Sequence, residues 1–333
     1  MLGDVELTRE PVLRIRDLRV GAAGGEIVRG ADLEVARGEI VGLVGESGCG
    51  KTTLGLAIAG LLGSSRRVVG GSIAFEGETI VDADTDGTGP LRGGRIGFVP
   101  QDPFGALDPL RHVGPQLARP LRLHKGLTEE AALERVCGLL SEVGMGDPRA
   151  ILRKYPHELS GGQLQRAVIA TAVSVEPTLL IADEPTSALD VIVQSQVLDA
   201  LLELVRGVGA AVILVTHDMG VVAETTARAI AMYAGKIVEF GPTNEMLASP
   251  RHPYLAALLA SRPHLHDERA RLFAIPGQPP ALPGRLWSCA FAPRCAFATR
   301  VCTEEEPEVA PGLEHGFACH HPLHDETRAT RRA

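Results

Sequence analysis

Short apolar runs separated by polar, glycine-rich turns dominate the first hundred residues of the chain. Runs at 12–20 and 27–35 predict two strands of an antiparallel edge sheet. Residues 72–77 and 95–100 predict two further strands, and a polar, glycine-rich connection at 82–94 lies between them. The N-terminal part is therefore expected to be rich in β-structure.

The pattern becomes helical after Leu107 and stays so to about Val175. Within this segment, residues 128–143 begin with Thr-Glu-Glu, which is a typical helix start. Strands and helices then alternate, at 178–182, 191–205, 211–216 and 219–226. Such alternation predicts an α/β fold in which helices cover both faces of a parallel sheet.

The stretch from Val41 to Leu54 carries the clearest chemistry. An apolar run at 40–44 predicts a buried strand, a loop of small residues follows it, and a helix is expected from Thr52 onward. The loop has the Gly-x-x-x-x-Gly-Lys-Thr spacing of a phosphate loop, in which glycines let backbone N–H groups turn toward an anion. Lys51 can reach the outer phosphates, and the Thr52 hydroxyl can ligate Mg²⁺. We therefore expect a nucleoside triphosphate to bind at Gly45, Glu46, Ser47, Gly48, Cys49, Gly50, Lys51, Thr52 and Thr53.

Cys49 lies inside this loop, beside Lys51 and the N-terminus of the expected helix. Both neighbours lower the pKa of a thiol, which predicts a reactive cysteine that MgATP protects. The alternative is that Cys49 is a small residue that fills the loop.

Two other stretches offer groups that fit a nucleotide. The strand at 178–182 ends in Asp183 and Glu184, where one carboxylate can hold Mg²⁺ through water and the other can polarise an attacking water. Adjacent acids at a strand end can equally be a solvated turn. Residues 159–166 place Ser160 as an N-cap before two glycines, which predicts an anion site at the start of a helix. One chain needs this second site only if it binds a nucleotide held by a partner.

Composition narrows the classes of protein. The chain has 333 residues, 45% of them hydrophobic, and a formal net charge of −8, which argues against dependence on a broad basic surface for nucleic acid. No uninterrupted apolar run is long enough to span a bilayer, and the first residues lack the pattern of a signal peptide. We expect a cytoplasmic location, with the six cysteines reduced or metal-bound.

The order and identity of these pieces resemble the ATP-binding cassette (ABC) family over about residues 12 to 260. The pieces are the phosphate loop, Gln101 after a strand, the signature Leu159-Ser160-Gly161-Gly162-Gln163, the Asp183-Glu184 strand end, Ser187-Ala188-Leu189-Asp190, and His217 after another strand. In this family two chains hold two ATP molecules head to tail. The resemblance implies the P-loop NTPase fold, with an edge antiparallel sheet and a helical subdomain at about 103–176.

The resemblance also implies a role for each matching residue. Lys51 would bind phosphate, Thr52 and Gln101 would contact Mg²⁺ together with Asp183, and Glu184 would act as the base or polarise the water. His217 would sense the γ-phosphate. Ser160 and Gly162, in the run Ser160-Gly161-Gly162-Gln163, would bind the γ-phosphate of the partner's nucleotide, and Asp190 would couple the two sites.

One feature departs from the family pattern. The family usually stacks adenine on an aromatic ring about thirty residues before the lysine, where this chain has Ala22, and no aromatic residue occurs between Met1 and Lys51. We expect weaker discrimination of the base rather than loss of binding, because such π contacts contribute on the order of 1 kcal/mol.

A narrower resemblance points to the oligopeptide/dipeptide (and nickel) importer branch. It rests on the runs at 101–109 and 249–254, the latter containing His-Pro-Tyr, and on Pro-Arg-Cys at 293–295. It implies an ATPase subunit that powers peptide import at the cytoplasmic face of the membrane, with a second ATPase subunit (a copy or a paralogue), two permease subunits and, indirectly, an extracytoplasmic peptide-binding protein. The alternatives are nickel as the solute, a soluble ABC ATPase acting on nucleic acid or ribosomes, and a regulatory subunit that does not hydrolyse ATP.

The C-terminal part is expected to form an extension of its own. We predict a nucleotide-binding domain at 1–260 and an extension at 261–333, with Pro276, Pro279, Pro280 and Pro283 marking the linker. Four of the six cysteines, Cys289, Cys295, Cys302 and Cys319, gather in the extension, which predicts a metal site. A [4Fe–4S] cluster is the first hypothesis, supported by the resemblance, since some importer ATPases carry one there. His315, His320 and His321 keep a zinc site open, and the remaining alternative is a reduced-thiol core around Trp287, Phe291, Phe297 and Phe317.

Overall fold

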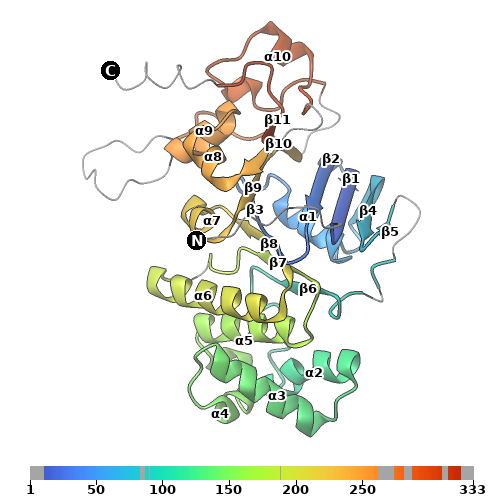
Figure 1. Ribbon diagram of the computed structural model, residues 1–333, viewed down its shortest axis with the longest axis vertical. Helices are drawn as coiled ribbons and strands as arrows, with labels where there is room; N and C mark the ends of the chain where they lie inside the picture. The colour runs from blue at the N-terminus through green and yellow to red at the C-terminus, as the bar shows by residue number, and fades with distance from the viewer. Residues whose placement is uncertain are drawn as a thin grey trace.

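The structure is a computed structural model, which describes residues 11–82, 87–89, 91–187, 189–261, 274–280, 287–309 and 314–323. Within these residues the strands form two sheets (Figure 1). The antiparallel sheet has the order β2-β1-β4-β5, built from Gly25–Val35, Leu13–Ala22, Arg66–Phe75 and Glu78–Val81. The larger sheet has the order β11-β10-β9-β3-β8-β7-β6, built from Gly316–Phe317, Lys236–Pro242, Arg228–Tyr233, Ile40–Val44, Ala211–Thr216, Leu179–Asp183 and Ile96–Val99.

The centre of the larger sheet is parallel, as the alternating pattern predicts. Strands β9, β3, β8, β7 and β6 all pair in parallel, and their carboxyl ends therefore lie at one edge. At the side of the sheet opposite β6, β10 pairs antiparallel with β9, and β11 pairs antiparallel with β10. The outermost strand, β11, comes from the C-terminal extension.

Helices cover the sheets and join them. They are α1 (Lys51–Ile58), α2 (Val113–Lys125), α3 (Glu129–Glu142), α4 (Pro148–Leu152), α5 (Gly161–Ser174), α6 (Val191–Val208), α7 (Met219–Thr225), α8 (Thr243–Ala248), α9 (Pro253–Ala260) and α10 (Arg300–Glu304), with 3₁₀ turns at Pro156–Glu158 and Ala292–Arg294. Helix α1 shares a core with the antiparallel sheet and one face of the larger sheet. Helices α2 to α6 share a second core with the other face, and α2 to α4 lie at the bottom of Figure 1. No helix in the described part of the chain combines the length and apolar character that crossing a bilayer requires.

Strand β4 is longer than the sequence pattern suggests, because it begins at Arg66 rather than Ser72. Gly70 and Gly71 interrupt its apolar alternation. The structure needs glycine at 71, where φ is 74° and a Cβ would collide with the backbone of Asp17 on β1. The close approach of β4 to β1 therefore requires a glycine that breaks the apolar alternation, and the first part of β4 could not be predicted from that alternation.

The described residues of the C-terminal extension, at the top of Figure 1, pack against β9, β10 and α9. Phe291 of the extension shares a buried cluster with Tyr233 of β9 and Tyr254 of α9, and their rings lie 5.3 and 5.5 Å from the Phe291 ring. Pro283 of the expected linker lies outside the described residues, whereas Pro276, Pro279 and Pro280 lie within them.

Candidate functional site

The phosphate loop connects β3 to α1 at the carboxyl edge of the parallel strands. Gly45 has φ 153°, and a Cβ there would collide with the Met232 carbonyl, so the turn requires glycine. The buried Lys51 donates from Nζ to the carbonyls of Gly45 at 2.8 Å and Glu46 at 3.1 Å. The loop therefore curls around its own lysine, with the N-terminus of α1 at its base.

Helix α1 and strand β7 bring two oxygen ligands together. The Thr52 hydroxyl donates to Asp183 Oδ1 over 3.2 Å, and Asp183 is the last residue of β7. Burial raises the pKa of the Asp183 carboxyl, and the Thr52 hydrogen bond lowers it by a smaller amount. A buried carboxylate beside a hydroxyl is a donor set that suits Mg²⁺, whose charge would stabilise the ionised acid.

Residues that follow three neighbouring strands come together at the Glu184 carboxylate. Its Oε2 accepts from Gln101 Nε2 at 3.2 Å and lies 3.3 Å from His217 Nδ1. Gln101 follows β6, Glu184 follows β7 and His217 follows β8. Glu184 has φ 44°, a left-handed conformation that costs free energy in a residue with a Cβ. The parallel sheet thus unites three residues that the sequence predicts separately.

These groups border a pocket of about 630 Å³, a volume within the usual range for small-molecule sites. Phosphate-loop residues, Gln101, Glu184 and His217 line it. Four lining residues were not predicted, namely Ile27, Met219, Leu258 and Ser261. They come from β2, α7 and the region of α9, and no local motif marks them.

No aromatic residue occurs among the described residues that line this pocket. Ala22 ends β1, opposite Gly25, and the residue of this hairpin that lines the pocket is Ile27. The apolar side chains that line the pocket are Ile27, Met219 and Leu258.

The hypothesis of a reactive Cys49 is wrong. Its side chain is 5% exposed, and burial raises the pKa of the thiol more than the nearby Lys51 lowers it. The alternative, a small buried residue that fills the loop, agrees with this environment.

The signature residues lie apart from this pocket. Ser160 caps α5, where its hydroxyl accepts from Gln163 N at 3.3 Å and its own N–H donates to Gln163 Oε1 at 3.1 Å. Gly162 packs so closely on α6 that a Cβ would lie 2.5 Å from Val193 Cγ1. None of the described residues that line the phosphate-loop pocket belongs to the signature, so the α5 N-terminus faces elsewhere.

Asp190 is exposed and caps α6, where it accepts from Val193 N at 3.0 Å. Of the preceding run, Ala188 lies outside the described residues.

The metal hypothesis for the extension is wrong. Cys289, Cys295, Cys302 and Cys319 are all described, yet no three or more His, Cys, Asp or Glu side chains in the described residues form a group that could hold a metal ion. The iron–sulfur cluster is therefore not supported, and neither is zinc. Burial raises the pKa of the Cys289 thiol, and that of Cys319 to about 12.

The four cysteines instead line a small cavity together with His252, His320 and His321; Cys302 is buried, and the other three are half-buried. Two of the thiols accept backbone hydrogen bonds at 3.4 Å, Cys295 from Phe297 and Cys319 from His321. Of the aromatic residues expected around them, Phe291 is buried, whereas Trp287 is 69% exposed.

Two residues far along the chain hold the phosphate loop and were not predicted. The Glu46 N–H donates to the Tyr254 hydroxyl at 2.7 Å. The Glu46 carboxylate accepts from Arg294 at 2.6 and 2.9 Å. These contacts span 208 and 248 positions, so no sequence period could indicate them.

Comparison with known proteins gives matches in two regions. Residues 28–187 match the family described as "ABC transporter", and residues 238–302 match "Oligopeptide/dipeptide transporter, C-terminal region". The probable peptide ABC transporter ATP-binding protein y4tR of Sinorhizobium fredii is 43% identical over 317 residues, covering 92% of this chain and 94% of that protein. The dipeptide transport ATP-binding protein DppD of Escherichia coli is 41% identical over 299 residues, covering 89% and 91%.

A solved structure is also similar. The ATP-binding cassette MJ0796, described as a dimer in a post-hydrolysis state bound to ADP and Pi, matches with a TM-score of 0.61 and 26% identity, covering 69% of this chain and 98% of that one.

Proposed function

Because the chain belongs to the ABC transporter family, we propose that it is the ATP-hydrolysing subunit of an importer of short peptides. One observation carries the proposal: the Glu184 carboxylate is held between Gln101 and His217 at the phosphate-loop pocket. A chain that only bound nucleotide would not need this arrangement, so it favours an enzyme over a regulatory subunit.

We assign the following tasks to the residues at and beside this pocket. The phosphate loop and Lys51 bind the phosphates of ATP, and Thr52, Asp183 and Gln101 would hold a Mg²⁺ ion that neutralises the phosphate charge. Glu184 orients and polarises the attacking water, because its carboxylate is fixed from two sides. His217, which is 62% exposed on its side chain, is placed to contact the γ-phosphate.

The position of the signature supports a dimer. The N-terminus of α5 offers backbone N–H groups outside its own pocket, as an anion site for another chain's nucleotide requires. We propose that Ser160, Gly161, Gly162 and Gln163 contact the γ-phosphate bound by a partner subunit, either a copy or a paralogue, and that Asp190 couples the two sites.

The membrane partners would dock on the helical subdomain. Phe104 and Leu110, 46% and 85% exposed, lie between Gln101 and α2 and give this loop an apolar surface beside the ATP site. We propose that two permease subunits bind here at the cytoplasmic face of the membrane and receive peptide from an extracytoplasmic binding protein. The division into a nucleotide-binding domain at 1–260 and an extension at 261–333 stays a prediction.

Similarity to peptide and dipeptide transport proteins over most of the chain favours a peptide as the solute. The test is the ATPase activity of the chain assembled with its permease subunits. We expect stimulation by a binding protein loaded with a dipeptide or tripeptide, and none by Ni²⁺, RNA or ribosomes. Stimulation by Ni²⁺ alone would identify Ni²⁺ rather than a peptide as the solute. Stimulation by RNA or ribosomes would overturn the assignment of the chain to transport.

A further inference from the structure

The C-terminal extension contacts the phosphate loop through Arg294. This residue lies in the 3₁₀ turn Ala292–Arg294, and its side chain is only 4% exposed. Its two terminal nitrogens pair with both carboxylate oxygens of Glu46, at 2.6 and 2.9 Å. Such a bidentate pair fixes the direction of the carboxylate as well as its charge.

Both partners are held by further contacts. Arg294 also donates to the Tyr233 hydroxyl at 3.2 Å and to the Pro276 carbonyl at 2.9 Å. On the other side, the Glu46 N–H donates to the Tyr254 hydroxyl at 2.7 Å. Glu46 is thus fixed through its backbone by α9 and through its side chain by the extension.

The position of Glu46 makes this pair consequential for nucleotide binding. Glu46 belongs to the phosphate loop, lines the pocket, and its carbonyl accepts a hydrogen bond from Lys51. An unpaired carboxylate at this position would repel the phosphates of ATP and would compete with them for Lys51. Arg294 neutralises that charge and turns it toward the extension.

We propose that Arg294 is a positioning residue of the ATP site, which keeps the Glu46 carboxylate away from the bound phosphates. It acts through Glu46, without touching the nucleotide. The extension would then be part of the apparatus that sets ATP affinity, in addition to its packing on the sheet. The inference rests on the proposed function only in assigning ATP to the phosphate loop.

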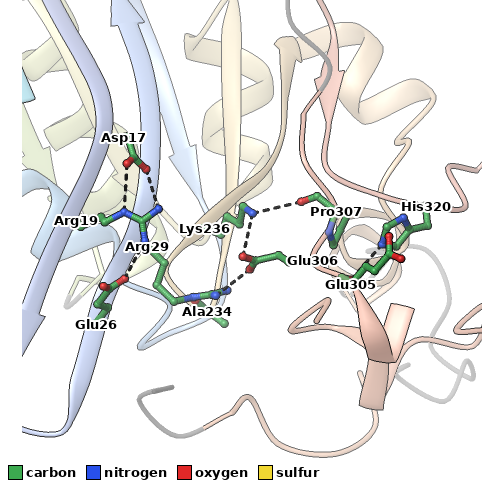
Figure 2. A network of polar contacts seen from close by, with 10 residues as sticks. All are labelled: Asp17, Arg19, Glu26, Arg29, Ala234, Lys236, Glu305, Glu306, Pro307 and His320. Atoms are coloured by element: carbon green, nitrogen blue, oxygen red, sulfur yellow. Dashed lines mark hydrogen bonds and ion pairs between the residues drawn. The ribbon is translucent and has the colours of Figure 1, made fainter. Parts of the chain in front are cut away.

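A purely structural role for Arg294 is the competing explanation, and a second attachment of the extension separates the two. Figure 2 shows Glu306 of the extension between Arg29 of β2 and Lys236 of β10. Glu306 pairs with Arg29 at 2.8 Å and with Lys236 at 3.3 Å. Glu306→Gln weakens this attachment and leaves the pair between Arg294 and Glu46 intact.

The experiment measures the Kd of the full chain for a magnesium complex of a non-hydrolysable ATP analogue. We expect Arg294→Ala to raise the Kd about tenfold, with KM for ATP rising in proportion and kcat little changed. Arg294→Lys, which keeps the charge but loses the bidentate geometry, should raise it less. Adding Glu46→Gln to Arg294→Ala should restore most of the affinity, because the repelling charge is gone. Glu306→Gln and the exposed Arg300→Ala should bind like wild type.

Rescue by Glu46→Gln supports the proposal, because a packing defect would persist in the double variant. Wild-type affinity of Arg294→Ala, a loss that Glu46→Gln does not relieve, or an equal loss in Glu306→Gln would each overturn it. If Arg294→Ala does not fold, the comparison of Arg294→Lys with and without Glu46→Gln gives the same decision. A chain that binds the analogue but shows no ATP hydrolysis when it is assembled with its partner subunits would refute the proposed function, and the Kd comparison would still decide the role of Arg294.

Discussion

Glu184 combines a carboxylate held from two sides with a backbone conformation that is unfavourable for a residue with a side chain. Its neighbours Gln101 and His217 lie within 3.3 Å of the same oxygen, and its φ is 44°. Strain of this kind persists only where the surrounding structure imposes it, and here the end of β7 and the contact of its N–H with the Val215 carbonyl do so.

Glu184→Gln should therefore separate binding from hydrolysis. The phosphate loop is untouched, so ATP should bind as in wild type, while turnover should fall at least about 100-fold because the amide cannot accept a proton. Single-turnover hydrolysis and equilibrium binding measure the two effects. Glu203→Gln, at an exposed position of α6, should behave like wild type. Near wild-type turnover in Glu184→Gln would show that another group activates the water.

The phosphate loop could be located from the sequence because the spacing of its glycines and lysine is set by local geometry, and the Asp183-Glu184 pair because it follows an apolar strand. Gln101 and His217 were expected only from the family resemblance. The environment of a single side chain could not be predicted in this way. The reactive thiol predicted at Cys49 failed because burial disfavours the thiolate, and a motif does not report burial. The metal predicted at the four C-terminal cysteines failed because, within the described part of the chain, folding brings no three or more ligating side chains into a group that could hold a metal ion.

Helices α3 and α5 both begin with a capping hydroxyl, Thr128 accepting from Ala131 N and Ser160 from Gln163 N, each at 3.3 Å. The two caps are alike as stabilising contacts, but only the cap of α5 belongs to the signature.

This likeness permits a matched comparison. Ser160→Ala and Thr128→Ala should each lower the free energy of unfolding by about 1 kcal/mol, which is typical for a lost N-cap. Only Ser160→Ala should also reduce ATP hydrolysis by the assembled dimer, because Ser160 is proposed to contact the partner's nucleotide. Urea unfolding and ATPase assays check the two parts. Equal activity of the two variants would argue that the α5 cap is structural only.

Elements with a regular period could be predicted from the sequence, and those defined by a partner strand could not. The parallel strands β3, β6, β7 and β8 and helix α3 lie where apolar spacing predicts them, whereas the parallel strand β9 lies beyond the last predicted element, at 219–226, and was missed. Strand β11 has two residues and exists because Gly316 and Phe317 pair with Phe240 and Glu239 of β10, a contact made by chain folding rather than by local preference.

At the scale of the molecule, the extension is fastened to the nucleotide-binding part by buried polar contacts. Glu239 is fully buried and accepts from Arg251 N, His252 N and His315 Nε2 at 2.7 to 2.9 Å. His252 is 1% exposed, and its Nδ1 accepts from Tyr254 N at 3.0 Å. These contacts join β10, the start of α9 and the strand β11 region.

His252 should make the stability of the protein depend on pH. Burial lowers its pKa to about 4, whereas an unfolded histidine titrates near 6.5. Its neutral form therefore stabilises the folded state above pH 6.5, and that contribution is lost as pH falls from about 6.5 to 4, because only the unfolded chain takes up the proton. Between pH 7 and 5 the loss should be about 2 kcal/mol.

The comparison is between wild type and His252→Asn, which keeps an N-cap and does not titrate. Their difference in free energy of unfolding, measured in urea, should shrink by that amount between pH 7 and 5, while the exposed His157→Asn should follow wild type. The buried Glu239 is common to all three proteins and cancels in the differences. Parallel pH profiles for wild type and His252→Asn would contradict the assigned protonation state.

The central claim is that hydrolysis at Glu184 drives peptide import, and uptake into vesicles tests it most directly. Vesicles that contain the permease subunits, the ATPase pair and ATP on the ATPase side are mixed with binding protein carrying a labelled dipeptide. We expect the dipeptide to accumulate on the ATPase side of the membrane, and this accumulation should require ATP, be abolished by Glu184→Gln and persist in Glu203→Gln. Dipeptide accumulation by the Glu184→Gln complex at the wild-type rate, or none by the wild-type complex while its ATPase is active, would contradict it.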